Sequence, residues 1–447
     1  KGRSAVRKQM ELFKSFILFF LVGLSLFLSY QIWMFKPDYE PFAREKYIEK
    51  VSIGEKKSID EVIQPYGTFV HLNGVHYEMS MKDETELFQY FKSCEIYNIK
   101  KSEKSYTKAD LYQQVSQGTF LQIEFSNEVS HLFLSGLFSN IQLDNLDFSF
   151  HHLLLSLNET KEGTFYFINE NTGQTFEGIF KTESWDDFKQ SLLSVDETKI
   201  LVAPFQFGDR QLFYLPVQGF YLEQLFFLTN QLDSEQFKNA LFSDPMYAKQ
   251  SGEEGNMPYT DGTRLLQEKS ENSSIVYVNP LNIDIKNQKS QKFQFESYNY
   301  INSHEGFTGD FYLSDVLESN RQVVFRMYYN HLPVFGKDIC TAIEVRWGDD
   351  ESLSYIHPSY ELGYQVEQEK VSVFLDSGYT VYEKLINAKH LDVNFVENIR
   401  IAYIMERENS FGQFVSLYPA WVVLYNGKWL ELETLLTTNG GEADGLE

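Results

Sequence analysis

Ser105 and Lys108 have the Ser-x-x-Lys spacing in which a lysine one helical turn away can activate a serine as a nucleophile. The tetrapeptide SYTK arises easily by chance in a chain of 447 residues. Neither of the S-D-N and K-T-G motifs that accompany this spacing in β-lactamase-type enzymes follows it. We therefore interpret Ser105 and Lys108 as non-catalytic.

His151 and His152 are adjacent, and adjacent side chains in a strand point to opposite faces, so we do not expect them to bind one metal ion together. One should lie inward with a satisfied hydrogen bond, and the other should be exposed. Cys94 and Cys340 have no histidine or second cysteine nearby at metal-ligand spacing. Two buried thiols are the favoured interpretation, because a disulfide would need the fold to bring these distant residues together.

Motifs for other chemistry are missing from the sequence, which has no HExxH, G-x-S-x-G, P-loop, GxGxxG or EF-hand spacing. The acid pairs Asp186-Asp187 and Asp349-Asp350 lie in polar stretches, where solvated surface is the default. A net charge of -24 with a pI near 4.8 removes the attraction that supplies most nucleic-acid affinity. We expect no enzyme activity, cofactor, metal, small-molecule substrate or nucleic-acid partner.

The composition indicates an α+β protein of several domains. Aromatic residues make up 16% of the chain and favour strands, and the length exceeds the roughly 250–300 residues at which single cores stop growing. Periodicity and capping residues predict helices at 83–94, 234–242 and 379–391. Strands are expected at 120–125, 141–148, 164–168, 200–205, 211–217, 263–267 and 274–278, and then at 322–330, 341–347, 398–406 and 414–433. The strand at 164–168 should be buried on both faces.

Residues 15–35 (SFILFFLVGLSLFLSYQIWMF) predict a transmembrane helix. The segment has 21 residues and no charge, close to the roughly 20 needed to span a bilayer, and thirteen of them are Leu, Ile, Val or Phe. A cleaved signal peptide is the alternative, but the apolar run is longer than usual and no A-x-A-like site follows it, which favours an uncleaved anchor. Because the sequence opens on Lys1, the initiating methionine is expected upstream or at Met10.

The charge distribution orients this helix. Residues 1–36 hold six Lys or Arg and one acid, a net charge of +5, which leaves -29 for residues 37–447. The positive-inside rule then places the N-terminus in the cytoplasm and the bulk of the chain outside the cell. We expect a cytoplasmic stub (1–14), the helix (15–35), an N-terminal extracytoplasmic domain (37–195), a central α+β domain (196–306), a C-terminal α+β domain (307–436) and a flexible tail (437–447). The exported sheets should be mostly antiparallel, with packed helices.

Ser25 and Ser29 are four residues apart on one face of the predicted helix, a small-xxx-small spacing that lets another helix approach closely. Gln31 adds a polar group near the outer interface. Small residues also occur in membrane helices that do not pair, so both readings stay open.

Several stretches together resemble the YycH family, also called WalH. They are WMFKP (33–37), FKNALFSDP (237–245), YTDGTRLL (259–266), FRMYYNHLPVFG (325–336) and LYPAWVVLYNGKW (417–429), and they follow the family's order over nearly the whole chain. The resemblance implies a non-enzymatic accessory protein with one membrane helix and a three-domain extracytoplasmic part. It further implies action with a YycI-like protein on a WalK-like sensor histidine kinase that controls cell-wall metabolism, with the helices of the three proteins associating in the membrane.

The predicted function is therefore that of a regulatory membrane protein, with an exported cell-wall-binding or hydrolytic domain as the alternative. A hydrolase should have a polar cleft with convergent acids, and a substrate-binding domain should have a deep pocket. A structure lacking both would favour the interaction protein. The resemblance identifies neither the contact residues nor the sign of the regulation.

Overall fold

The computed structural model describes residues 14, 17–28, 52–143, 146–159, 161–194, 199–208, 211–251, 257–280, 290–348, 352–366, 371–408, 413–438 and 445–446. Residues 1–50 and 51–447 are two separate units. In the first unit, residues 17–28 are helical and exposed. Within the described ranges, no helix has the length and apolar character needed to cross a membrane. The transmembrane helix expected at 15–35 therefore stays a prediction.

Several helices of the second unit begin after a side chain that accepts a hydrogen bond from the first helical turn, as Ser80, Thr107, Asp233 and Ser377 do. The helices are α2 (Met81–Phe91), α3 (Lys108–Gln117), α4 (Leu134–Leu137), α5 (Trp185–Leu193), α6 (Ser234–Leu241), α7 (Ser290–Ser303), α8 (Gly378–Asn387) and α9 (Leu432–Thr437), with short 3-10 turns at Ile59–Glu61, His131–Phe133, Glu318–Asn320 and Val393–Phe395.

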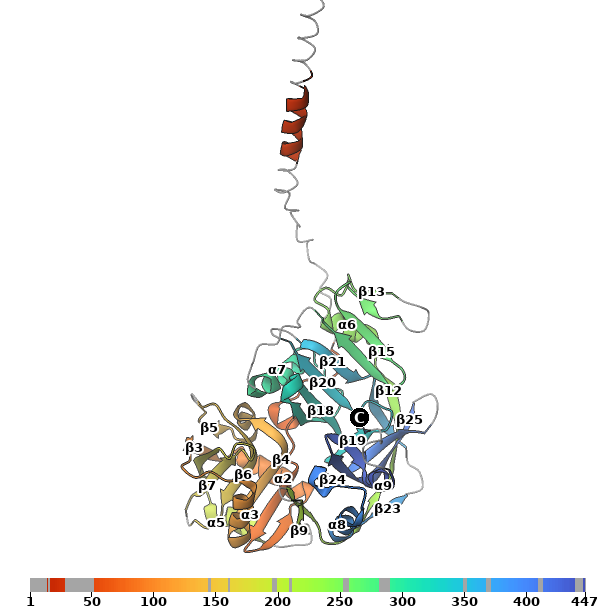
Figure 1. Ribbon diagram of the computed structural model, residues 1–447. Helices are drawn as coiled ribbons and strands as arrows, with labels where there is room; N and C mark the ends of the chain where they lie inside the picture. The colour runs from red at the N-terminus through yellow and green to blue at the C-terminus, as the bar shows by residue number, and fades with distance from the viewer. Residues whose placement is uncertain are drawn as a thin grey trace, which may run out of the picture. The chain divides into compact units, whose positions relative to one another are not determined.

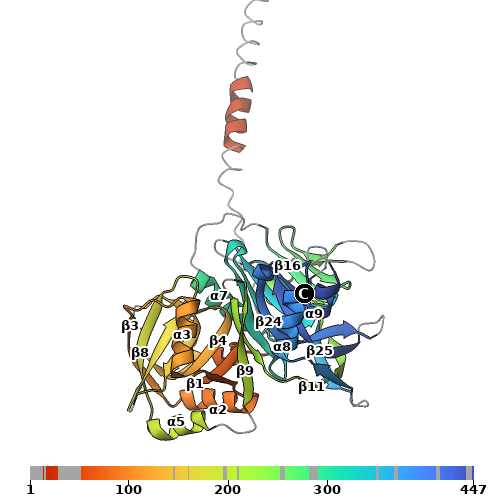
Figure 2. The same ribbon diagram turned by 60° about the horizontal axis from the view of Figure 1, so that its bottom comes forward.

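The N-terminal half is built on one sheet, in which each described pair is antiparallel except β3 with β5. In spatial order its strands are β10 (Gln211–Pro216), β9 (Ile200–Phe207), β2 (Val75–Glu78), β1 (Gly67–Leu72), β4 (Thr119–Ser130), β6 (Ser149–Ser156), β7 (Gly163–Ile168), β8 (Thr175–Lys181), β3 (Glu95–Lys101) and β5 (Asn140–Ile141). Helix α3 packs Leu111 and Val115 against one face (Figure 2). Helices α2 and α5 cover the other face through residues such as Phe91 and Phe188.

The second large sheet is also mostly antiparallel, the described exception being β19 with β24. Its order is β13 (Lys249–Gln250), β14 (Tyr259–Thr260), β15 (Leu265–Lys269), β16 (Ser274–Val278), β21 (Ser352–Pro358), β20 (Ala342–Trp347), β18 (Gln322–Tyr329), β19 (Leu332–Gly336), β24 (Val396–Arg407), β25 (Phe414–Tyr425), β12 (Leu225–Gln231) and β22 (Tyr360–Gln365); β17 (Phe311–Leu317) pairs with β18, and β26 (Lys428–Glu431) with β25. A separate ribbon pairs β11 (Phe220–Glu223) with β23 (Ser372–Leu375). Figure 1 shows the two large sheets side by side.

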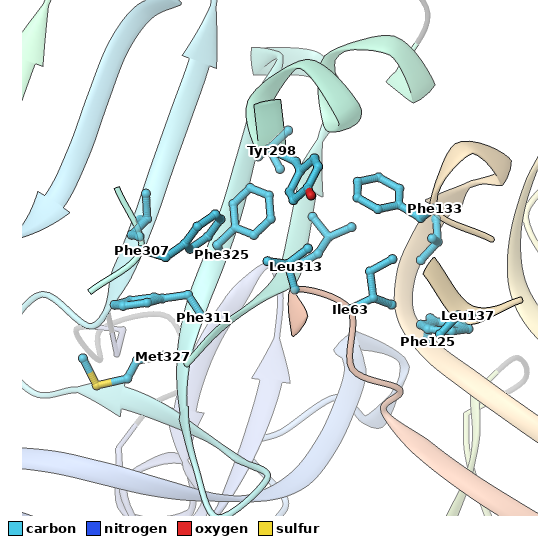
Figure 3. Packing of buried hydrophobic residues seen from close by; sticks show 14 of the residues in the cluster. Ile63, Phe125, Phe133, Leu137, Tyr298, Phe307, Phe311, Leu313, Phe325 and Met327 are labelled. Atoms are coloured by element: carbon cyan, nitrogen blue, oxygen red, sulfur yellow. The ribbon is translucent and has the colours of Figure 1, made fainter. Parts of the chain in front are cut away.

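One buried cluster of hydrophobic side chains contains residues from both large sheets. Figure 3 shows Ile63 between Leu313, on β17 of the second sheet, and Phe125 and Leu137 of the N-terminal half. Helix α7 adds Tyr298 to the same cluster. The two halves of the second unit thus share a continuous core, which holds the space between the sheets in a defined geometry.

The predicted α+β class with mostly antiparallel sheets is confirmed, and some elements differ. The strand expected at 141–148 was wrong: β5 ends at Ile141, β6 begins at Ser149, and the described residues between them are not in a strand. The strand at 164–168 exists, but Thr164 and Tyr166 are only partly buried, so burial on both faces was wrong as well. The three-domain division of residues 37–436 stays a prediction.

Candidate functional site

The serine and the cysteines singled out in the sequence are engaged locally. The Ser105 hydroxyl donates to the backbone carbonyl of Gly173 at 2.7 Å, and Lys108 begins α3. Cys94 and Cys340 are buried and not joined in a disulfide, as predicted for two buried thiols. The Cys94 thiol donates to the Tyr90 carbonyl at 3.3 Å, and burial raises its pKa. These groups do not form a shared site.

The expectation for the histidine pair was partly wrong, because both rings are buried. Residues of β6 are covered on both faces of the sheet, and His151 and His152 are only 5% and 4% exposed. They do point to opposite sides, as predicted for adjacent strand residues. His151 Nε2 lies 3.3 Å from the Asn171 amide nitrogen, whereas His152 Nε2 lies 3.1 Å from a carboxylate oxygen of Glu170.

His152 belongs to a row of hydrogen-bonded polar side chains that crosses four strands, which we call the histidine row: His76, His71, Gln122, His152 and Glu170. His71 Nδ1 lies 2.7 Å from His76 Nδ1, and His71 Nε2 lies 3.0 Å from Gln122 Oε1. Gln122 Nε2 lies 3.3 Å from His152 Nδ1. With this amide orientation, His71 donates from Nε2 to Gln122 and accepts at Nδ1 from His76, while the Gln122 amide nitrogen donates to His152.

Burial keeps the first two histidines neutral. Desolvation lowers the pKa of His71 to about 3, with a further contribution from the neighbouring His76, and desolvation also lowers the pKa of His76. Within the described residues, no group of three or more His, Cys, Asp or Glu side chains is arranged to hold a metal ion. The histidine row therefore ties β2, β1, β4 and β6 together through side-chain hydrogen bonds, with His71 and His76 neutral.

This row was not predicted from the sequence, although a local signal was present. Asn73-Gly74 is a two-residue hairpin turn, with φ of 48° and 93°, and it places His71 directly opposite His76. Reading HLNGVH as a hairpin would have put the two rings on the same face.

A groove of about 770 Å³ lies between the two halves of the second unit. One wall comes from the start of β1, the ends of β2 and β10, and the N-terminus of α2, and the other from β11, β24, β25 and the β18–β19 turn. Its lining is largely apolar and includes Phe69, Met79, Leu215, Phe220 and Trp421. A volume of this size is typical of sites that bind a compact ligand.

Four charged residues line the groove: Glu78, Lys82, Glu84 and Arg400. The Arg400 guanidinium lies over the rings of Tyr66, at 4.9 Å, and Tyr328, at 5.8 Å. Desolvation raises the pKa of Glu78 to about 7 and that of Glu84 to about 8, although Arg400 opposes the first shift and a hydrogen bond from Thr68 opposes the second. Both carboxyl groups are therefore poised to titrate near neutral pH.

The β11–β23 ribbon contributes β11 to the second wall of the groove. Alternating residues of β11 face opposite ways: Phe220 and Leu222 line the groove, whereas Tyr221 is 68% exposed. On the paired strand, Phe374 is 53% exposed, and its ring lies 5.0 Å from that of Tyr221. We call the exposed pair Tyr221 and Phe374 the ribbon surface. Figure 2 labels β11 beside β25.

The candidate helix-contact residues are only partly described. Ser25 is exposed within the helical residues 17–28. Ser29 and Gln31 lie outside the described residues. The helix contact stays a prediction.

Comparison with known proteins shows which family the chain belongs to. A protein of Bacillus subtilis (strain 168), "Two-component system WalR/WalK regulatory protein YycH", is 24% identical over 464 residues, covering 98% of this chain and 99% of the relative. The crystal structure of YycH from Bacillus subtilis superposes with a TM-score of 0.73 at 21% identity, covering 85% of this chain and 98% of that one, and so shares the fold. Residues 11–195 match the family of the YycH protein N-terminal domain, and residues 210–440 match that of the YycH protein C-terminal domain. With both domains present in order, the chain belongs to the YycH family.

Proposed function

We propose that this protein is a membrane-anchored extracytoplasmic regulator of a WalK-like sensor histidine kinase and that it acts together with a YycI-like partner on the control of cell-wall metabolism. The observation that carries the proposal is family membership across both halves of the chain. A relative aligned over nearly its full length is named a regulatory protein of the WalR/WalK two-component system. The proposed role is one of binding rather than catalysis.

The proposed location is the cell membrane, crossed once by residues 15–35, with the N-terminus in the cytoplasm and the acidic bulk outside. The lack of charge in this segment and the net charge of +5 before Pro37 support this orientation. Sensor kinases change state through small shifts of their helices. A neighbouring helix that binds one state better shifts the population by its differential affinity and no more.

We assign the helix contact to Ser25 and Ser29, with Gln31 as a polar partner near the outer interface. Replacing both serines with Leu should weaken co-purification with the kinase about tenfold, since bulky side chains hold the two helix backbones apart. Gly23→Leu is the matched control, because Gly23 is also small but lies on the opposite helix face. Unchanged co-purification of the serine variant, with normal export, would contradict the assignment.

We place the ectodomain contact with the YycI-like partner at the ribbon surface. Exposed aromatic side chains dominate the energetics of many protein interfaces, and Tyr221 and Phe374 are exposed next to each other on rigid paired strands. Tyr221→Ser with Phe374→Ser should weaken crosslinking to the partner. Met246→Ser with Tyr247→Ser is the control pair, because these residues are 79% and 70% exposed and lie far along the chain from the ribbon. Equal loss in both pairs would point to a general effect of surface apolar area.

A cell-wall-binding or hydrolytic domain is the second candidate, and the groove is the observation that favours it. A structure without a deep pocket would have favoured the interaction protein, and the groove does not meet that criterion. Incubation of the full-length protein with purified cell walls separates the candidates. We expect no release of soluble wall fragments, and release that is lost in Glu84→Gln would favour the hydrolase.

A further inference from the structure

The groove has an unusual combination of an apolar lining and carboxyl groups with spare hydrogen-bonding capacity. Among the described residues, none donates a hydrogen bond to the Glu78 carboxyl group or brings a cation within 4.0 Å of it, and Glu78 lines the groove. Glu84 accepts one hydrogen bond, from the Thr68 hydroxyl at 3.1 Å, and has no ion pair in the described part of the chain. A carboxylate withdrawn from water and left without donors costs free energy.

The cations near the groove do not fill this need. The Arg400 guanidinium is held between two tyrosine rings and lies 3.4 Å from the Tyr328 hydroxyl. The Lys82 side chain lines the groove, but its ammonium lies 3.9 Å from a carboxylate oxygen of Glu86, which is not a lining residue, and it forms no ion pair with Glu78 or Glu84 in the described part of the chain. The two groove carboxyl groups therefore have no positively charged hydrogen-bond donor in contact with them, next to the apolar wall.

We propose that the groove binds a small organic cation with an apolar body, whose ammonium or guanidinium head lies at Glu78 and Glu84 and whose chain or ring packs against Phe69, Leu215 and Trp421. The volume of about 770 Å³ suits a compact ligand of this kind. The ectodomain charge of about -29 further favours a cationic ligand over an anionic one. This inference does not depend on the proposed regulatory function, so either can fail without the other.

The electrostatic surroundings give the binding a defined pH dependence. Glu78 is influenced by Arg400 and Glu124, and Glu84 by Glu78. Below pH 7 both carboxyl groups are largely protonated, and a cation gains little from them. As the pH rises through about 7 and 8, the carboxylates form and the cation should bind more tightly, releasing protons from the protein.

The test uses full-length protein in detergent and three matched probes: 4-phenylbutylamine, 4-phenylbutanol and 4-phenylbutyrate. Isothermal titration at pH 8 should show binding of the amine, at least about tenfold weaker binding of the alcohol, and no binding of the carboxylate. Affinity for the amine should fall by at least about tenfold in Glu78→Gln with Glu84→Gln. The control is Glu86→Gln, on the exposed face of α2, the helix that carries Glu84. This variant should bind the amine as the wild type does.

Thermal unfolding of each variant verifies that the fold is intact before titration. Equal binding of amine and alcohol would show an apolar cavity without the charge preference and would overturn the proposal. Amine binding that survives the double substitution would place the cation elsewhere and overturn it as well. So would the absence of any amine binding at pH 8.

Discussion

The pKa values of side chains such as Glu84 depend more on their surroundings in the fold than on their neighbours in the sequence. Glu84 lies in the first turn of α2, where a carboxylate is normally favoured by the helix dipole. Desolvation in the groove wall overrides this effect and raises its pKa to about 8. The sequence shows the position in the helix but not the groove, because the opposite wall comes from elements between Phe220 and Trp421, more than 100 residues further along the chain.

Glu84→Gln should therefore become more stable than the wild type as the pH rises. The folded-state pKa of about 8 lies above the ordinary value of 4.5, so the protonated form contributes stability that is complete below 4.5 and is lost as the pH rises through 8. The advantage of the variant should be close to zero at pH 5 and on the order of 1–3 kcal/mol at pH 8. Urea unfolding at both pH values measures it, with Glu86→Gln as the control. A constant difference would contradict the assignment.

The histidine row predicts the opposite pH trend. His71 has a folded-state pKa of about 3, below its ordinary 6.5, so the unfolded chain binds its proton first and stability is lost as the pH falls from 6.5 towards 3. Between pH 6 and 4, His71→Phe should reduce the slope of unfolding free energy against pH by about 1.4 kcal/mol per unit. Chemical unfolding across this range tests the prediction, and an unchanged slope would show that His71 is not the group responsible.

At the scale of elements, the β1–β2 hairpin shows what the sequence could and could not predict. The Asn73-Gly74 turn was readable and fixes the register that joins His71 to His76. By contrast, helix α7 (SQKFQFESYNYINS) was not predicted, because its aromatic residues favour a strand when the sequence is considered alone. Tertiary packing decides the matter: α7 buries Phe293 and Tyr298 in the shared core, and Gln294 bonds the β4 backbone.

Gly74→Ala should destabilise the hairpin and, through it, the histidine row. Gly74 has φ of 93°, a conformation that disfavours a Cβ atom, and the expected cost is about 1–2 kcal/mol. Gly74→Asn should cost less, because asparagine tolerates positive φ better. Thermal unfolding of both variants makes the comparison. Equal costs would mean that steric crowding, not backbone conformation, sets the preference for glycine.

At the scale of the whole second unit, the two sheets should unfold together. Ile63 packs between them in the shared core and is 5% exposed. Ile63→Ala should cost about 2–5 kcal/mol while leaving a single transition. Hydrogen exchange provides the measurement: protection of β4 and β18 amides should fall by the same factor. Loss confined to one sheet would show that the halves unfold independently.

Predicting the α+β class needed only strand patterns and capping residues, both of which are local. The groove and the histidine row depend on pairings between distant strands, such as β1 with β4 and β4 with β6. Ser25, Ser29 and Gln31 remain predictions of a different kind, since their proposed partner is another chain.

The β11–β23 ribbon has one further consequence. Tyr221 on the ribbon surface is joined by a single peptide unit on each side to Phe220 and Leu222, which line the groove. A displacement of the β11 backbone at Phe220 or Leu222 therefore also displaces Tyr221, with no residue between them. If an occupant of the groove moves β11, occupancy of the groove and occupancy of the ribbon surface become thermodynamically linked, and the linkage is reciprocal: whatever factor one occupant applies to the other's affinity is returned unchanged.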